Sequence, residues 1–105
     1  MGREKLIKII ENGKQVGISK MIKKGGTSFA YTYAIQKINS KYIVYMDEYD
    51  LDSYYADEMD KETQKTVIYD HLTDFINNFS TKYGVTFEDF NISKGQRYFN
   101  ADLFY

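Results

Sequence analysis

Residues 28–48, with the sequence SFAYTYAIQKINSKYIVYMDE, contain the clearest strand pattern of this 105-residue chain and decide its fold. β-branched and aromatic residues dominate the first half of the stretch, and they recur at every second position. A two-residue turn at Asn39–Ser40 would join two strands into a hairpin and pair Ile35 with Val44. One face of that hairpin carries Phe29, Tyr31, Tyr33, Ile35, Val44 and Met46. We expect this face to pack against the core.

The opposite face of the same hairpin has a mixed composition. It carries Ala30, Thr32, Ala34, Ile43, Tyr45 and Asp47. Because small and polar side chains offer little apolar area to bury, we expect this face to be partly exposed to water.

Upstream of the hairpin, residues 4–10 fit either a strand or a short helix. The Asn12–Gly13 pair that follows is a strong signal for a hairpin turn. We therefore favour strands at 4–10 and at about 14–22. Gly25–Gly26 then interrupts the chain before the central hairpin begins.

Downstream of the hairpin, two further strands are expected at residues 53–59 and 64–69, around a turn at 60–62. The second of these is the better strand sequence, because KTVIY at its end is rich in β-branched residues.

After Asp70 the apolar residues follow a helical period. The stripe consists of Leu72, Phe75, Ile76, Phe79 and Tyr83, which predicts a helix over about residues 71–83. Asp70 suits the N-cap position of this helix, and Gly84 suits the position just after its last turn. Thr86 with Asp89 predicts one more helical turn, stabilised by a side-chain cap.

These elements predict a single α+β domain over residues 1–105. The contiguous strands form an antiparallel sheet of four to five strands, and the C-terminal amphipathic helix, about 71–83, packs on one face. The aromatic tail, residues 95–105, either adds a strand or packs over the helix.

Composition excludes several classes of protein. The chain contains no cysteine, so disulfides and zinc-thiolate sites are absent. No apolar run approaches the roughly 18 residues of a membrane-spanning helix, and the N-terminus lacks the apolar region of a secretory signal. We expect a cytoplasmic protein with no membrane partner.

Candidate catalytic and metal-binding residues are sparse. His71 is the only histidine, and no cluster with metal-ligand spacing accompanies it. The acidic run starting at Asp50 fails the calcium-loop pattern, because Tyr55 stands where the turn glycine is needed and Lys61 where the bidentate glutamate is needed. A looser cation site in this run stays open. With no phosphate-binding loop or catalytic triad in the sequence, we expect no catalytic residues, no cofactor and no metal.

The net charge of −1 conceals a division along the chain. Residues 1–45 carry nine Lys or Arg against two Glu, a net +7, whereas residues 46–105 carry five against thirteen acidic residues, a net −8. Such asymmetry points to charged partners. The alternative is that the two halves lie side by side and partly neutralise each other.

The negative charge is densest in residues 45–62, YMDEYDLDSYYADEMDKE, which hold eight carboxylates, four tyrosines and one lysine. Tyrosine is enriched at protein interfaces, and carboxylates steer a basic partner towards its binding site. Carboxylates spaced along strands can also imitate the phosphates of a nucleic acid. The predicted partner-binding residues are Asp47, Glu48, Tyr49, Asp50, Asp52, Tyr54, Tyr55, Asp57, Glu58 and Asp60.

In size, composition and charge layout, the chain resembles the small phage-encoded DNA mimics that block restriction or CRISPR nucleases. The resemblance implies a non-enzymatic inhibitor that binds a protein partner with a basic surface and does not itself bind nucleic acid. One alternative is an immunity protein that neutralises a basic toxin nuclease. An alternative of another class is a small nucleic-acid-binding regulator that uses basic residues such as Lys20, Lys23 and Lys24. The oligomeric state stays open.

Overall fold

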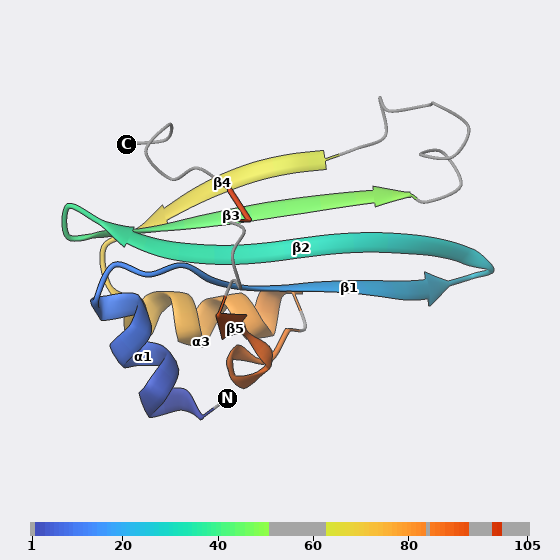
Figure 1. Ribbon diagram of the computed structural model, residues 1–105. Helices are drawn as coiled ribbons and strands as arrows, with labels where there is room; N and C mark the ends of the chain where they lie inside the picture. Colours follow the sequence, from blue (N-terminus) through green and yellow to red (C-terminus); the bar gives the residue numbers. More distant parts are fainter. Residues whose placement is uncertain (1, 51–62, 84, 93–97, 100–105) are drawn as a thin grey trace.

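The computed structural model describes residues 2–50, 63–83, 85–92 and 98–99, and it has an α+β architecture. Five antiparallel strands form one sheet in the order β4-β3-β2-β1-β5. The helices α1, α3 and η2 all lie on one side of this sheet (Figure 1). The elements are α1 (Arg3–Glu11), β1 (Val16–Lys24), β2 (Thr27–Ile38), β3 (Lys41–Asp50), β4 (Thr63–Tyr69), α3 (Leu72–Tyr83), η2 (Phe87–Asp89) and β5 (Asn91–Ile92).

The β2–β3 hairpin has the predicted register. Ile35 pairs with Val44, and the turn residues Asn39 and Ser40 have φ angles of 51° and 68°. Positive φ at both central positions gives the turn the twist that matches its flanking strands, which explains why two residues suffice. The predicted core face is confirmed: its buried members are Tyr33, Ile35, Val44 and Met46.

A second tight hairpin joins β1 to β2. Gly25 and Gly26 also have positive φ angles, 56° and 83°, and Lys24 pairs with Thr27 across the turn. The glycine pair therefore connects two strands directly, because residues without a Cβ adopt this geometry at no steric cost. Strand β4 completes the described sheet and confirms the strand expected at 64–69. The strand expected at 53–59 and its turn at 60–62 lie outside the described residues.

The preference for a strand at residues 4–10 is wrong, because this segment is helix α1. Leu6 and Ile10 are four residues apart and both fully buried, whereas Lys8 between them is exposed. A strand would place Lys8 on the same face as Leu6 and Ile10, and a helix separates it from them. The burial of Leu6 and Ile10 and the exposure of Lys8 therefore fit the period of a helix and not the alternation of a strand.

The Asn12–Gly13 pair ends helix α1 and does not form the expected hairpin turn. Gly13 has a φ of 83°, and its N–H donates to the carbonyl oxygen of Ile10 at 2.9 Å. The N–H of Lys14 donates to the carbonyl oxygen of Ile9 at 3.2 Å. This pair of bonds is the Schellman arrangement, in which a left-handed glycine satisfies the last carbonyl groups of a helix.

Helix α3 confirms the helix predicted over residues 71–83, and it packs an aromatic face on the sheet. Phe75 is 1% exposed, and its ring centroid lies 5.0 Å from that of Phe79. The rings of Phe87 and Phe90 both stand edge-on to Phe75, each with centroids 6.0 Å away. Edge-to-face contacts of this kind contribute about 0.5–1.5 kcal/mol each beyond burial. The aromatic cluster therefore joins α3 to the segment that follows it.

Two predicted helix caps are absent. Helix α3 begins at Leu72, the carbonyl of His71 accepts its first backbone bonds, and the carboxylate of Asp70 accepts a hydrogen bond from Lys41. The predicted turn after Thr86 is present as η2, but the Thr86 side chain makes no capping hydrogen bond. Lys41, a partner distant in sequence, draws the Asp70 carboxylate away from the helix end.

The face opposite the helices is more buried than expected. Ala34 and Ile43 are fully buried there beneath Phe99, and Tyr98 packs beside them. One of the two sequence alternatives was that the tail packs over the helix. These two tail residues instead cover the opposite face of the sheet. Burying one phenylalanine contributes about 1.5–3 kcal/mol, and ordering two residues costs about 2–4 kcal/mol. The free energy gained by burial and the entropy cost of ordering are therefore nearly equal. Hydrogen bonds from Tyr98–Phe99 to the buried side chain of Gln15 add the stabilisation that holds the two tail residues on the sheet.

Replacement of Phe75 by alanine should destabilise the domain by roughly 3–5 kcal/mol, because it leaves a cavity in the aromatic cluster. Chemical denaturation followed by circular dichroism measures this loss. Asn78→Ala, at an exposed position of the same helix, is the control and should change stability by less than about 0.5 kcal/mol. Equal stabilities for the two variants would contradict the packing described for α3.

Candidate functional site

The candidate site is the acidic segment, residues 45–62, which begins in the C-terminal half of β3. Asp47 is the backbone partner of Thr32, and Glu48 is the partner of Tyr31. Successive side chains of a strand point to opposite faces of the sheet. The Asp47 side chain therefore lies on the face opposite the helices, and the Glu48 side chain lies on the helix side. The structure therefore distributes these two carboxylates over both faces of the sheet, and they do not form a single row.

Glu48 is held in place from the core. The hydroxyl of Tyr33, a residue only 3% exposed, donates a hydrogen bond to the Glu48 carboxylate. The Tyr33 ring stands edge-on to Phe79 with centroids 5.2 Å apart, and it packs 4.9 Å from the ring of Tyr31. The hydroxyl of a buried tyrosine thus holds the Glu48 carboxylate on the helix side.

Sequence reasoning missed this role of Tyr33, although a signal for it exists. Tyr33 pairs with Met46, so Glu48 is its diagonal neighbour two residues further along the partner strand. A buried tyrosine hydroxyl needs a hydrogen-bond partner, and a diagonal carboxylate within reach is a natural one. The predicted register alone was sufficient to suggest this pair.

Most of the predicted partner-binding residues lie outside the described part of the chain. These are Asp52, Tyr54, Tyr55, Asp57, Glu58 and Asp60. For Tyr49 and Asp50 the structure gives the backbone partners, which are Ala30 and Phe29. Tyr45, the first residue of the acidic segment, stacks on Phe99 with ring centroids 5.3 Å apart and ring planes 10° from parallel.

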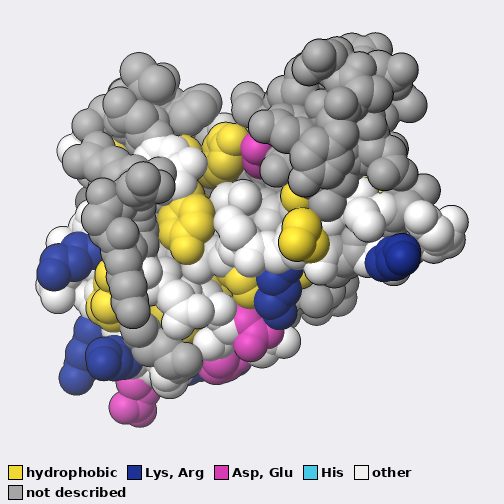
Figure 2. All heavy atoms as spheres, turned by 45° about the vertical axis from the view of Figure 1, so that its right-hand side comes forward, with side chains coloured by type: hydrophobic (Ala, Val, Ile, Leu, Met, Phe, Trp, Pro, Cys, Tyr) yellow, Lys and Arg dark blue, Asp and Glu magenta, His cyan; other side chains and the backbone are white. Residues whose placement is uncertain are grey.

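Basic and acidic side chains lie close together on much of the surface. Lys20 and Glu48 are both backbone partners of Tyr31, so their Cα atoms lie about 10 Å apart, two strand spacings. On the face seen in Figure 2, several Lys and Arg side chains adjoin Asp and Glu. Partial neutralisation between the two halves of the chain, the alternative given above, is therefore present.

Four ion pairs join described residues to one another. They are Arg3–Glu88 at 2.7 Å, Lys20–Asp89 at 3.8 Å, Lys37–Glu11 at 2.7 Å and Lys41–Asp70. Three of them join the basic first part of the chain to the acidic second part. All four take their carboxylate from outside residues 47–60.

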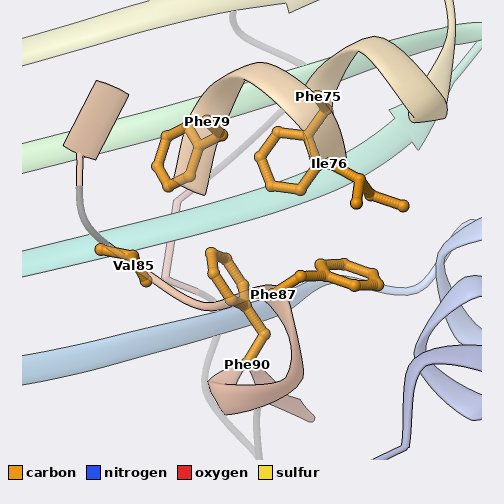
Figure 3. Close-up of a pocket in the computed structure, with 6 residues that line it drawn as sticks. All are labelled: Phe75, Ile76, Phe79, Val85, Phe87 and Phe90. Carbon is orange, nitrogen blue, oxygen red and sulfur yellow. The ribbon is translucent and has the colours of Figure 1, made fainter. Parts of the chain in front are cut away.

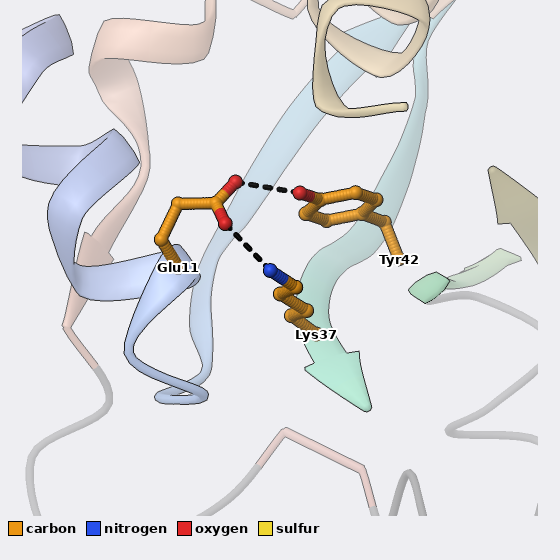
Figure 4. A network of polar contacts seen from close by, with 3 residues as sticks. All are labelled: Glu11, Lys37 and Tyr42. Atoms are coloured by element: carbon orange, nitrogen blue, oxygen red, sulfur yellow. Dashed lines mark hydrogen bonds and ion pairs between the residues drawn. The ribbon is translucent and has the colours of Figure 1, made fainter. Parts of the chain in front are cut away.

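Glu11, Lys37 and Tyr42 form a polar cluster that attaches the end of α1 to the sheet (Figure 4). The Glu11 carboxylate accepts hydrogen bonds from Lys37 Nζ at 2.7 Å and from the Tyr42 hydroxyl at 2.6 Å. These two donors lower the pKa of Glu11 below its ordinary value of 4.5, the Lys37 bond most strongly. The same contacts raise the pKa of Lys37, whereas the pKa of Tyr42 is raised first by burial.

Two exposed carboxylates also have lowered pKa values. The Lys41 hydrogen bond lowers the pKa of Asp70, and the backbone N–H of Glu88 itself, followed by Arg3, lowers the pKa of Glu88. Both groups are accessible to solvent, where salt screens such pairs and their contribution to stability is small. These contacts are structural links between the halves of the chain, and they do not create a reactive group.

The apolar hollow beside α3 is part of the core, and the described residues contain no cluster of metal ligands. The hollow between α3 and η2 is lined only by apolar side chains, and Figure 3 shows Phe75 and Phe79 of α3 facing Phe90 across it. It has no room for a water molecule, so it belongs to the core. No group of three or more potential metal ligands occurs within the described ranges, and His71 is exposed. No described helix is long and apolar enough to cross a membrane.

Comparison with known proteins found no match for this chain: no family model, no curated protein and no solved structure is significantly similar to it.

Neutralising Glu11 should make the domain less sensitive to acid. Because the folded-state pKa of Glu11 is lowered, its contribution to stability is present above about pH 4.5 and is lost as the pH falls through the folded value. Glu11→Gln should therefore unfold at a lower temperature than the unmodified chain at pH 7, with the difference shrinking below pH 4.5. Thermal unfolding at a series of pH values measures this.

Glu4→Gln is the matched control, because Glu4 lies on the same helix and is exposed. Its difference from the unmodified chain should stay small and constant across the same pH range. A Glu11→Gln difference that does not depend on pH would mean that the cluster does not contribute through charge.

Proposed function

We propose that the chain is a non-enzymatic inhibitor whose segment 45–62 occupies a basic, nucleic-acid-binding surface of a nuclease-type target protein. One observation carries this proposal: residues 45–62 hold eight of the thirteen carboxylates of the acidic part of the chain, against one lysine. In the described residues, carboxylates at positions 11, 70, 88 and 89 pair with Lys or Arg of the basic half.

Glu48 supports the same conclusion. Its described partner is the neutral hydroxyl of Tyr33, which orients the carboxylate without cancelling its charge. An oriented, charged acceptor at a surface position suits an arginine or lysine side chain of a partner, since charge-assisted hydrogen bonds are the stronger kind. The cost of ordering this carboxylate is met by the fold before the partner arrives.

The remainder of the segment has the composition of an interface. Five further carboxylates at positions 50–60 give long-range attraction to a cationic surface, which raises association rates at low salt. Tyr49, Tyr54 and Tyr55 are interspersed with them and offer large contact areas at a low cost in side-chain entropy. Charge steers the encounter, and the aromatic rings slow dissociation.

Charge reversal within the segment should abolish target binding and leave folding unchanged. In the variant that combines Asp52→Lys and Asp57→Lys, we expect at least a tenfold loss of affinity for a target captured from the native host. The thermal unfolding temperature should stay close to that of the unmodified chain, because we expect carboxylates in so acidic a segment to be solvated, and solvated positions tolerate substitution at a cost of about 0.5 kcal/mol or less. Surface plasmon resonance at several salt concentrations measures both the affinity and its electrostatic part.

The matched control combines Glu4→Lys and Asp74→Lys, which change the net charge by the same amount. Both positions are exposed and lie on the helices. This control should retain binding, and the unmodified chain should displace nucleic acid from the captured target. Equal losses in both double variants would reduce the effect to net charge and remove the assignment to the segment.

The chain alone should not bind duplex DNA at physiological salt. Lys20 already lies 3.8 Å from Asp89, and Glu48 is two strands away from it, so the basic edge of the sheet offers phosphates a weak field. Electrophoretic mobility shifts with random-sequence duplex at about 0.15 M salt test this. Micromolar binding that disappears on replacing Lys20 and Lys23 by glutamine would support the regulator instead.

A further inference from the structure

The face of the sheet opposite the helices holds the main chain of the tail with a single buried side chain. Gln15 is 8% exposed, and its Oε1 accepts hydrogen bonds from the N–H groups of Tyr98, at 2.5 Å, and Phe99, at 3.3 Å. Its Nε2 donates to the carbonyl oxygen of Phe99 at 2.9 Å. One amide group therefore serves both donors and an acceptor of two consecutive residues.

The Gln15 amide is itself oriented by a second glutamine. Gln15 Nε2 also donates to Gln36 Oε1 at 3.1 Å, and Gln36 Nε2 donates to the carbonyl oxygen of Gly13 at 3.0 Å. The chain of bonds fixes which atom of each amide donates and which accepts. The side chains that orient the tail-binding amide therefore come from the turn after α1 and from β2, and not from the tail.

The side chains of the tail fit two complementary surfaces. Phe99 covers Ala34 and Ile43 and stacks on Tyr45, with ring centroids 5.3 Å apart. Tyr98 lies over Gly17, where a Cβ atom would stand 2.7 Å from two carbons of the Tyr98 ring. Only glycine at this position lets an aromatic ring approach the sheet so closely.

We propose that Gln15, Gly17, Ala34, Ile43 and Tyr45 form a peptide-binding slot for an extended segment with two adjacent aromatic residues. Tyr98–Phe99 fills this slot in the free chain, and a partner protein's segment of the same chemistry replaces it. Main-chain hydrogen bonds hold any such segment, while the Gly17 surface and the Ala34–Ile43 surface select its two rings. The proposal does not depend on the acidic segment.

Exchange is feasible because the slot is separate from the main core. The buried residues of the slot form their own small cluster, and the sheet lies between them and the aromatic cluster of α3. Release of two residues therefore leaves the described ring contacts of Phe75 and Phe79 intact. The tethered pair nevertheless acts at an effective concentration on the order of 1 mM, so a free peptide competes with it poorly.

Vacating the slot in the full-length chain should allow a peptide to bind. The variant combines Tyr98→Ala and Phe99→Ala, and the probe is a fluorescein-labelled peptide with the sequence of residues 95–101, GQRYFNA. Fluorescence anisotropy should show saturable binding to this variant, at least tenfold tighter than to the unmodified chain. A peptide with alanine at both aromatic positions should not bind.

Gln15→Ala in the vacated variant should weaken the peptide at least tenfold, whereas Asn78→Ala, on the far side of the sheet, should leave its affinity unchanged. In the unmodified chain, the amides of Tyr98 and Phe99 should exchange with solvent much faster than the amide of Val44. Three results would each overturn the proposal: no peptide binding by a folded vacated variant, unfolding of that variant, or exchange of the tail amides only with global unfolding. A dimer that trades its tail segments would assign the slot to a second copy of the chain and not to a partner protein.

Discussion

The two-residue turn at Asn39–Ser40 is the constraint on which the rest of the structure depends. Positive φ at both residues fixes the register of β2 against β3, and a shift of one residue would exchange the two faces of β3. With this register, Tyr33, Ile35, Val44 and Met46 face the helices, while Ala34 and Ile43 face the tail. One turn thus decides which residues form the main core and which form the opposite-face slot.

The same register places the functional groups. Tyr33 lies diagonally opposite Glu48, so the hydroxyl of a core tyrosine reaches the first carboxylate of the helix side. Tyr45 and Asp47 alternate with these positions and lie on the face opposite the helices, where the Tyr45 ring stacks on Phe99. Strand β3 therefore supplies both the start of the acidic segment and one wall of the slot, from alternate residues.

Parts of this arrangement follow from local sequence, and those parts were predicted. The period of two in β2 and β3, the stripe of α3 and the short turn between the strands each depend on residues close in sequence. Helix α1 was not predicted, because five residues with four apolar side chains satisfy both periods, and Asn12–Gly13 suits a hairpin turn and a helix end equally. The position of Lys8 decides between them only once the location of the core is known.

Contacts between distant residues account for the other differences. Gln15 meets Tyr98 and Phe99 across more than eighty positions, and Asp70 is drawn to Lys41 instead of capping α3. No periodicity in the sequence encodes such pairs. The identity of the acidic segment, in contrast, is a matter of composition, so sequence alone suffices to propose it, although its ten candidate residues need not share one surface. Asp47 and Glu48 already point to opposite faces of the sheet.

That alternation limits how the segment can imitate a nucleic acid. Phosphates of one strand follow a continuous line, whereas neighbouring carboxylates of a strand in this sheet diverge. A target that reads Glu48 approaches from the side of α3 and η2, and it meets Lys20 with its partner Asp89 beside the same strand end. A target that reads Asp47 approaches from the side of the slot. The two carboxylates therefore belong to different approaches, and the orientation of Glu48 by Tyr33 favours the helix side as the one the fold prepares for a basic partner.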